Sequence, residues 1–125
     1  MQGGRLLRWD RIPVRYPDRE ARRQRLRQEL RAIVARIIDP DTERILLFGS
    51  TARGTVRSTS DLDLLVVRHD SRPPTVRADD LYRRAESRVA LDLLVYTPEE
   101  LETERTRSSF LRTALRDAEV VYERS

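Results

Sequence analysis

Apolar residues recur at every third or fourth position between residues 26 and 37, and the positions around them are rich in arginine. This spacing predicts a helix with one apolar face and one strongly charged face. Asp18 is suited to cap the start of the helix, and Pro40 cannot continue it. We therefore expect a helix over residues 18–38, preceded by an N-terminal arm over residues 1–17.

Short apolar runs follow this helix and alternate with segments that have helical spacing. The expected strands cover residues 44–48, 61–67, 89–96 and 119–122, and the expected helices cover residues 76–87, a segment that begins at Pro98 after the capping residue Thr97, and about residues 108–118. Alternating strands and helices predict an α/β (α+β) fold in which helices cover a small mixed sheet. We expect residues 18–125 to form a single domain, with the arginine-rich helix at its start.

All 25 basic residues are arginines, and the chain has no cysteine and a single histidine. The lack of lysine excludes Schiff-base chemistry and a Walker-type phosphate loop, which both need a lysine amine. The lack of cysteine excludes disulfides, thiol nucleophiles and thiolate metal sites, and one histidine cannot supply a zinc motif that needs a pair. Any catalysis must therefore use carboxylates, hydroxyls and arginines.

The positive charge is concentrated near the N-terminus. Residues 1–36 contain 11 arginines and four acidic residues, whereas residues 37–125 contain 14 arginines and 17 acidic residues. The basic segment could bind nucleic-acid phosphates directly, although an arginine-rich helix face is more often only a solvated surface. The chain shows no secretory signal and no apolar run long enough to span a membrane. We therefore expect a cytoplasmic protein that does not enter a membrane.

Two aspartates stand at the start of the second expected strand. Successive side chains of a strand point to opposite faces, so Asp61 and Asp63 lie on one face and Leu62 and Leu64 on the other. Two carboxylates this close repel each other unless a cation lies between them, and Mg²⁺ binds carboxylate oxygens while it keeps phosphate and water ligands. The pattern indicates a metal site at the rim of the sheet. The pair alone leaves a solvated strand end as the alternative.

A third aspartate, Asp92, interrupts an apolar run that we expect to be buried on both faces. An unpaired carboxylate is costly there, so it needs an arginine, a hydrogen-bond network or a metal ion. The tetrapeptide Asp-Leu-Leu-Val occurs twice, beginning at Asp63 and at Asp92. Neighbouring strands in matching register would place these aspartates side by side, and three converging carboxylates would form a divalent-metal site. A structural salt bridge at Asp92 is the alternative.

A glycine and a hydroxyl follow the first expected strand. Gly49 and Ser50 lead to Arg53, in a turn that we expect to open a short helix. Backbone N–H groups at a helix N-terminus, a hydroxyl and a guanidinium together can bind a phosphate. An ordinary turn with Ser50 as the helix cap is the alternative. Ten residues separate Ser50 from Asp61, so the combined pattern is Gly-Ser-x10-Asp-x-Asp.

This combined pattern resembles the nucleotidyltransferase core of the polymerase-beta superfamily, and the short MNT-type nucleotidyltransferases are the most similar group. The resemblance extends over most of residues 44–122. It implies a polymerase-beta-like fold, ATP as a substrate, Mg²⁺ or alternatively Mn²⁺ as the cofactor, and a nucleotide site made by Gly49, Ser50 and Arg53. The catalytic and metal-binding residues that it implies are the three aspartates, Asp61, Asp63 and Asp92.

The larger relatives carry a helical domain that binds the base and the acceptor, and we expect no room for one after Tyr122. Another protein is therefore expected to supply the acceptor. The minimal members are similar to antitoxins paired with a HEPN-domain ribonuclease toxin, and the resemblance implies transfer of AMP to a hydroxyl of such a partner. Two alternatives stay open: an antitoxin that neutralises its partner by contact alone, and a nucleotidyltransferase that modifies a small molecule.

Overall fold

The computed structural model describes residues 4–48 and 60–125, with side chains from residue 19 onward in these ranges. The helices of this part of the chain are α1 (Gly4–Ile37), α3 (Pro74–Ala85), α4 (Pro98–Arg107) and α5 (Ser109–Asp117). Its strands are β1 (Thr42–Phe48), β2 (Leu62–Arg68), β3 (Leu91–Tyr96) and β4 (Glu119–Glu123). None of the described helices has the length and apolar character needed to cross a membrane.

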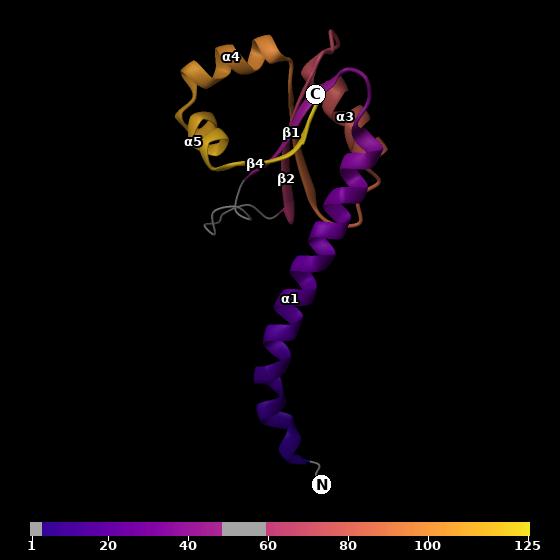
Figure 1. Cartoon of the computed structure of the whole chain (residues 1–125), viewed down its shortest axis with the longest axis vertical. Helices are drawn as coiled ribbons and strands as arrows, with labels where there is room; N and C mark the ends of the chain where they lie inside the picture. Colours follow the sequence, from indigo (N-terminus) through magenta and orange to yellow (C-terminus); the bar gives the residue numbers. More distant parts are fainter. Residues whose placement is uncertain (1–3, 49–59) are drawn as a thin grey trace.

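The four strands form one mixed sheet in the order β3-β2-β1-β4. β1 is antiparallel to both β2 and β4, whereas β2 and β3 are parallel. Figure 1 shows α1 and α3 on one side of this sheet and α4 and α5 on the other. The expected fold class, an α/β (α+β) fold with a small mixed sheet covered by helices, is therefore confirmed.

The apolar stripe of α1 and one face of the sheet form the larger core. Leu30, Ile33 and Ile37 are almost fully buried, and their spacing puts them on one face of the helix. The strand residues of this core, and two residues of α3, are Ile45, Leu47, Leu62, Leu64, Val66, Leu91, Leu93, Val95, Leu81 and Ala85. Burial of each large side chain contributes about 1.5–3 kcal/mol, so this core fixes the C-terminal half of α1 against the sheet.

The opposite face of the sheet carries a smaller core under α4 and α5. Its buried residues are Leu46, Phe48, Leu65, Val67, Leu101, Leu111 and Ala114. The ring of Phe48 also meets the ring of Phe110 edge-on, with 6.5 Å between the centroids. Because both cores share β1 and β2, these two strands are buried along most of their length, whereas β4 is largely exposed.

Capping residues set the starts of α4 and α5. The Thr97 hydroxyl accepts a hydrogen bond from the backbone N–H of Glu100 at 3.1 Å, and the Glu100 carboxylate accepts one from the Thr97 N–H at 3.0 Å. This reciprocal capping box, with Pro98 in the first turn, confirms the predicted start of α4. The Ser108 hydroxyl caps α5 through the Leu111 N–H.

The start of α1 is where the structure differs most from the prediction. The helix begins at Gly4, and Asp18 is therefore an internal residue and not a cap. Residues 5–11 are mostly arginine and leucine, which are strong helix formers, but Pro13 and Pro17 inside the helix oppose it, so propensity alone does not explain the early start. Figure 1 shows this N-terminal half extending away from the sheet. The other elements begin and end within two residues of their predicted bounds.

A buried arginine, Arg68, connects neighbouring elements at the end of β2. The guanidinium of Arg68 donates to Asp39 Oδ2 at 2.7 Å and to Asp70. Arg72 donates to both carboxylate oxygens of Asp70, each at 2.8 Å. The hydrogen bonds from Arg72 and the charge of Arg68 hold the pKa of Asp70 well below its usual range. The ion pairs therefore link the end of β2 to Asp39, which lies before β1, and to Asp70, which follows β2.

A second buried arginine joins the two helical layers. Arg77 of α3 donates from Nη1 and Nη2 to the two carboxylate oxygens of Glu100 in α4, at 2.6 and 2.9 Å. Arg77 is 4% exposed, and its hydrogen bonds lower the pKa of Glu100. Glu100 thus completes the cap of α4 and pairs with α3 at the same time.

Replacing Arg77 should destabilise the fold. In Arg77→Ala, Glu100 loses its bidentate partner, and the buried aliphatic part of the Arg77 side chain is removed. We therefore expect the free energy of unfolding to fall by about 2 kcal/mol. Arg83→Ala is the matched control, because Arg83 forms an exposed pair with Asp79 on the same helix and should cost less than about 0.5 kcal/mol. Urea unfolding measures both values, and equal losses would contradict the assigned role of Arg77.

Acid should destabilise the protein through the same carboxylates. The pKa values of Asp70 and Glu100 are lowered in the folded protein, so both groups stabilise the fold above about pH 4 and lose this contribution as the pH falls through their folded pKa values. In Asp70→Asn, we expect lower stability at neutral pH and a smaller fall between about pH 5 and pH 2. Urea midpoints across this range test the expectation, which an unchanged pH dependence in Asp70→Asn would refute.

Candidate active site

β2 begins at the end of the sheet where β1 ends, and we refer to this end as the sheet edge. Asp63 is the register partner of Phe48, the last residue of β1. Strand alternation puts Asp63 on the same face as Leu65, which is part of the smaller core. Leu62 and Leu64 are in the larger core on the opposite face. The predicted separation from these leucines is therefore present for Asp63, whereas Asp61 lies before β2 and its face is not set by the strand.

The parallel pairing of β2 and β3 brings Asp92 beside Asp63. The two aspartates are register partners, and the leucines and valines that follow them pair in the same way. Adjacent strands lie about 4.8 Å apart, and register partners project to the same face. The two Asp-Leu-Leu-Val segments therefore lie side by side, as their repetition predicts.

The prediction that Asp92 is buried is wrong. β3 is an edge strand, and its burial alternates, so Leu91 and Leu93 are buried while Asp92 is exposed. α4 begins at Pro98, beyond the other end of β3, and so it leaves the start of this strand open on the face that carries Asp92. Asp92 is therefore accessible from solvent and needs no buried partner.

Asp61 lies one residue before β2, and two groups hold its carboxylate. Oδ1 accepts a hydrogen bond from Arg22 Nη2 at 2.9 Å, and Oδ2 accepts one from the backbone N–H of Ala90 at 3.0 Å. The Ala90 N–H and the Arg22 guanidinium lower the pKa of Asp61. Asp61 is therefore ionised at neutral pH and held at the edge that also carries Asp63 and Asp92.

Asp63 has a different environment from the other two aspartates. It is 3% exposed, and the Ser60 hydroxyl donates a hydrogen bond to its Oδ1. The edge of the sheet thus carries one buried carboxylate, one carboxylate bound by an arginine and one exposed carboxylate. Their environments are distinct enough for the three groups to have different tasks in one site.

The helix α1 makes a second contact with this edge of the sheet. Arg27 donates from Nη1 and Nη2 to the two carboxylate oxygens of Glu119, at 3.0 and 2.8 Å. Glu119 begins β4 and is the register partner of Leu47. The hydrogen bonds from Arg27 lower the pKa of Glu119. Figure 1 shows α1 passing this end of the sheet and continuing beyond it.

Sequence analysis did not single out Arg22 or Arg27. Their partners are 39 and 92 positions away along the chain, and nothing distinguishes these two arginines from the others of the segment. The concentration of positive charge in residues 1–36 was the one sequence signal that pointed to them. Two of these positive charges, Arg22 and Arg27, form ion pairs with Asp61 and Glu119 at the sheet edge.

The oxygen donors of three carboxylates suit a hard divalent cation. Within residues 4–48 and 60–125, no group of three or more His, Cys, Asp or Glu side chains has the arrangement needed to hold a metal ion. The carboxylate of Asp61 is instead directed to Arg22 and Ala90. The donor chemistry therefore fits a metal, and a cation that bound all three aspartates would compete with the Arg22 guanidinium for Asp61.

The predicted nucleotide-binding residues Gly49, Ser50 and Arg53 lie outside the described residues. In the chain, Gly49 and Ser50 come directly after Phe48, which pairs with Asp63. Their assignment to a phosphate site therefore stays a prediction.

The model of the family described as "Nucleotidyltransferase domain" matches residues 23–101, which include all three aspartates. A crystal structure at 1.40 Å of a protein from Sulfolobus solfataricus, proposed to be a nucleotidyltransferase, is similar with a TM-score of 0.49 and 24% identity, over 78% of this chain and 76% of that one. The chain has no significant match among curated proteins. Because the family match spans more than half of the sequence, the chain belongs to the nucleotidyltransferase domain family.

Proposed function

We propose that this protein transfers AMP from ATP to an acceptor hydroxyl, with Mg²⁺, or alternatively Mn²⁺, as its cofactor. The observation that carries the proposal is the register pairing of Asp63 with Asp92. Asp61 precedes Asp63 by two residues, and the chain belongs to the nucleotidyltransferase domain family. Transfer of a phosphoryl-type group depends mainly on positioning and on neutralisation of charge. A cluster of carboxylates at a sheet edge is suited to both tasks.

Asp61, Asp63 and Asp92 are the residues that would hold the metal. When bound, a divalent cation neutralises phosphate oxygens and lowers the pKa of the attacking hydroxyl. In the reaction, the acceptor oxygen forms a bond to the α-phosphorus, and the bond from the α-phosphorus to the oxygen that bridges to the β-phosphate breaks, so pyrophosphate leaves. The exposed carboxylate of Asp92 is accessible to the acceptor and is our candidate for the base that takes the hydroxyl proton.

The triphosphate is assigned to Gly49, Ser50 and Arg53. These residues supply backbone N–H groups, a hydroxyl and a guanidinium, which together suit phosphate oxygens. The position of Gly49 in the sequence supports the assignment. Gly49 directly follows Phe48, and Phe48 is the register partner of Asp63 in the neighbouring strand.

The acceptor that we propose is a hydroxyl of a HEPN-type toxin, for which this protein would be the antitoxin. The resemblance to the minimal nucleotidyltransferases supports this partner. The exposure of Asp92 also supports it, since no described helix covers the sheet face at the start of β3, and a macromolecule could approach there. Neutralisation by contact alone and transfer to a small molecule are the competing possibilities that the experiment must separate.

Transfer should be visible as a change in the mass of the partner. Incubation of the protein with ATP, Mg²⁺ and a HEPN-type partner protein should add one AMP to that partner, as measured by intact mass spectrometry. Asp63→Asn should reduce the rate by about a thousandfold or more, because a neutral amide cannot replace a carboxylate in charge neutralisation. Asp79→Asn, the same change at an exposed position of α3, should leave the rate within about twofold.

The outcomes separate the three possibilities. A partner that binds and is neutralised but keeps its mass, and that Asp63→Asn still neutralises, would identify a contact antitoxin. Pyrophosphate release that depends on a small hydroxyl compound, and not on the partner, would identify a small-molecule enzyme. An absence of pyrophosphate release with every acceptor would refute nucleotidyl transfer itself.

Removing Arg22 should strengthen the binding of a divalent cation. The Arg22 guanidinium and the cation compete for Asp61, and an exposed ion pair contributes about 0.2–1 kcal/mol, so Arg22→Gln should lower the dissociation constant for Mn²⁺ by up to about fivefold. Electron paramagnetic resonance of free Mn²⁺ measures this constant without nucleotide or turnover. Arg23→Gln removes the same charge from the neighbouring exposed position, and an equal change in that control would show that only net charge matters.

A further inference from the structure

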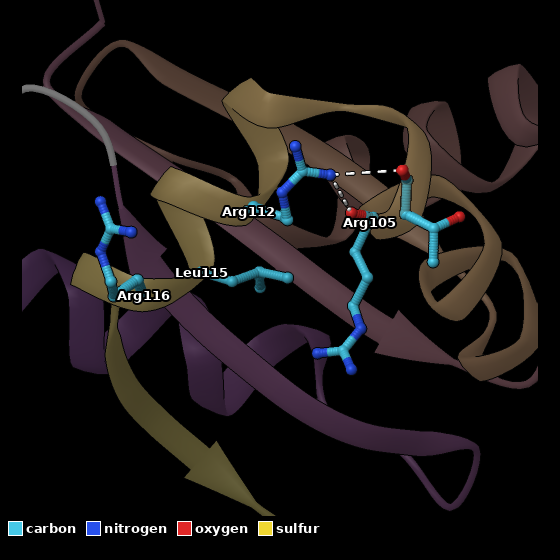
Figure 2. Close-up of a pocket in the computed structure, with 5 residues that line it drawn as sticks. Arg105, Arg112, Leu115 and Arg116 are labelled. Carbon is cyan, nitrogen blue, oxygen red and sulfur yellow. Dashed lines mark hydrogen bonds between the residues drawn. The ribbon is translucent and has the colours of Figure 1, made fainter.

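A hollow between α4 and α5 carries three arginines (Figure 2). It has a volume of about 530 Å³ and is lined by Arg105, Thr106, Arg112, Leu115 and Arg116. Arg105 and Thr106 are at the end of α4, and the other three residues belong to α5. The Leu115 side chain lies among the three arginines in Figure 2, and it packs against the smaller core. We refer to this feature as the arginine hollow.

The arginine hollow has no carboxylate among its lining residues. The buried arginines Arg68 and Arg77 donate to carboxylates at hydrogen-bonding distance. Arg105 and Arg116, in contrast, donate no hydrogen bond to a carboxylate of the described residues, and their shortest distances to one are 3.6 Å, to Glu102, and 3.8 Å, to Asp117. Their terminal amino groups are therefore available to an anion from outside the domain.

Arg112 is oriented without being neutralised. Its Nη1 donates to the backbone carbonyl oxygens of Arg105 at 2.9 Å and of Thr106 at 3.2 Å (Figure 2). These carbonyls are in the last turn of α4, where a helix leaves its carbonyl groups without intrahelical partners. The acceptors are carbonyl dipoles with only partial negative charge, so this contact leaves a net positive charge, and the orientation of the guanidinium is set before a ligand binds.

We infer that the arginine hollow binds the phosphate groups of a polyphosphate or of a nucleic-acid strand. Guanidinium groups donate pairs of hydrogen bonds that match phosphate oxygens. Three of them, distributed over two helices around a hollow of this size, match an anion with several linked charges better than a single small ion. The apolar surface of Leu115 offers a contact for a sugar or a base. None of the three aspartates of the proposed active site lines the hollow.

The test measures the binding of a fluorescent single-stranded RNA and of inorganic tripolyphosphate to the full chain. EDTA is present, so that metal-dependent binding at the aspartates does not contribute. The double variant Arg105→Gln/Arg116→Gln removes two guanidinium groups from the hollow and keeps Arg112 of α5 with its hydrogen bonds to the backbone carbonyls of α4. Arg83→Gln/Arg107→Gln is the matched control, because it removes the same charge from exposed arginines that do not line the hollow.

We expect the affinity for at least one ligand to fall about tenfold or more in the hollow variant and less than about twofold in the control. A loss for RNA alone identifies a nucleic-acid strand as the ligand, and a loss for tripolyphosphate identifies a free polyphosphate. Equal losses in both variants, or no binding of either ligand to the native chain, would overturn the inference. Equal binding of a polyglutamate peptide of the same charge would overturn the assignment to phosphate. Circular dichroism verifies the fold of each variant.

Discussion

The in-register, parallel pairing of β2 with β3 is the constraint on which the proposed active site depends. It places the leucines and valines of two identical segments side by side, in the two cores that cover the sheet. A slip of one residue would turn these side chains to the wrong face, so burial of apolar surface fixes the register. Asp63 and Asp92 are the first residues of the two segments, so the fixed register keeps them next to each other. Hydrophobic packing thus holds together two like charges that would otherwise repel each other.

Elsewhere in the domain, arginines pair with carboxylates in two different ways. Arg68 and Arg77 are buried and bind carboxylates that connect elements, so they stabilise the domain. Arg22 and Arg27 reach the sheet edge from α1 in exposed pairs, and exposed pairs are weak enough to exchange one cation for another. Only the exposed type of pair suits a site that must release a carboxylate to a ligand. Burial therefore separates the structural arginines from those that can take part in binding.

Much of the fold could be predicted because its signals are local. The helix cap at Thr97 and the apolar spacing of α1 each depend on residues within one or two turns, and both predictions were correct. The predicted start of α1 was wrong because a residue that can cap a helix does not prevent the helix from beginning further upstream. The burial of Asp92 was wrong because an apolar run does not state whether its strand lies at the edge of the sheet or in its centre.

By itself, the sequence determined the order of the elements, the faces of each strand and the repeat that pairs Asp63 with Asp92, because each of these follows from the period of a helix or a strand and from residue type. Only the tertiary structure decided that Arg22 meets Asp61, that Asp92 faces solvent, and that three arginines surround one hollow between α4 and α5. These contacts join residues far apart in the chain, and their geometry is set by how the helices pack on the sheet.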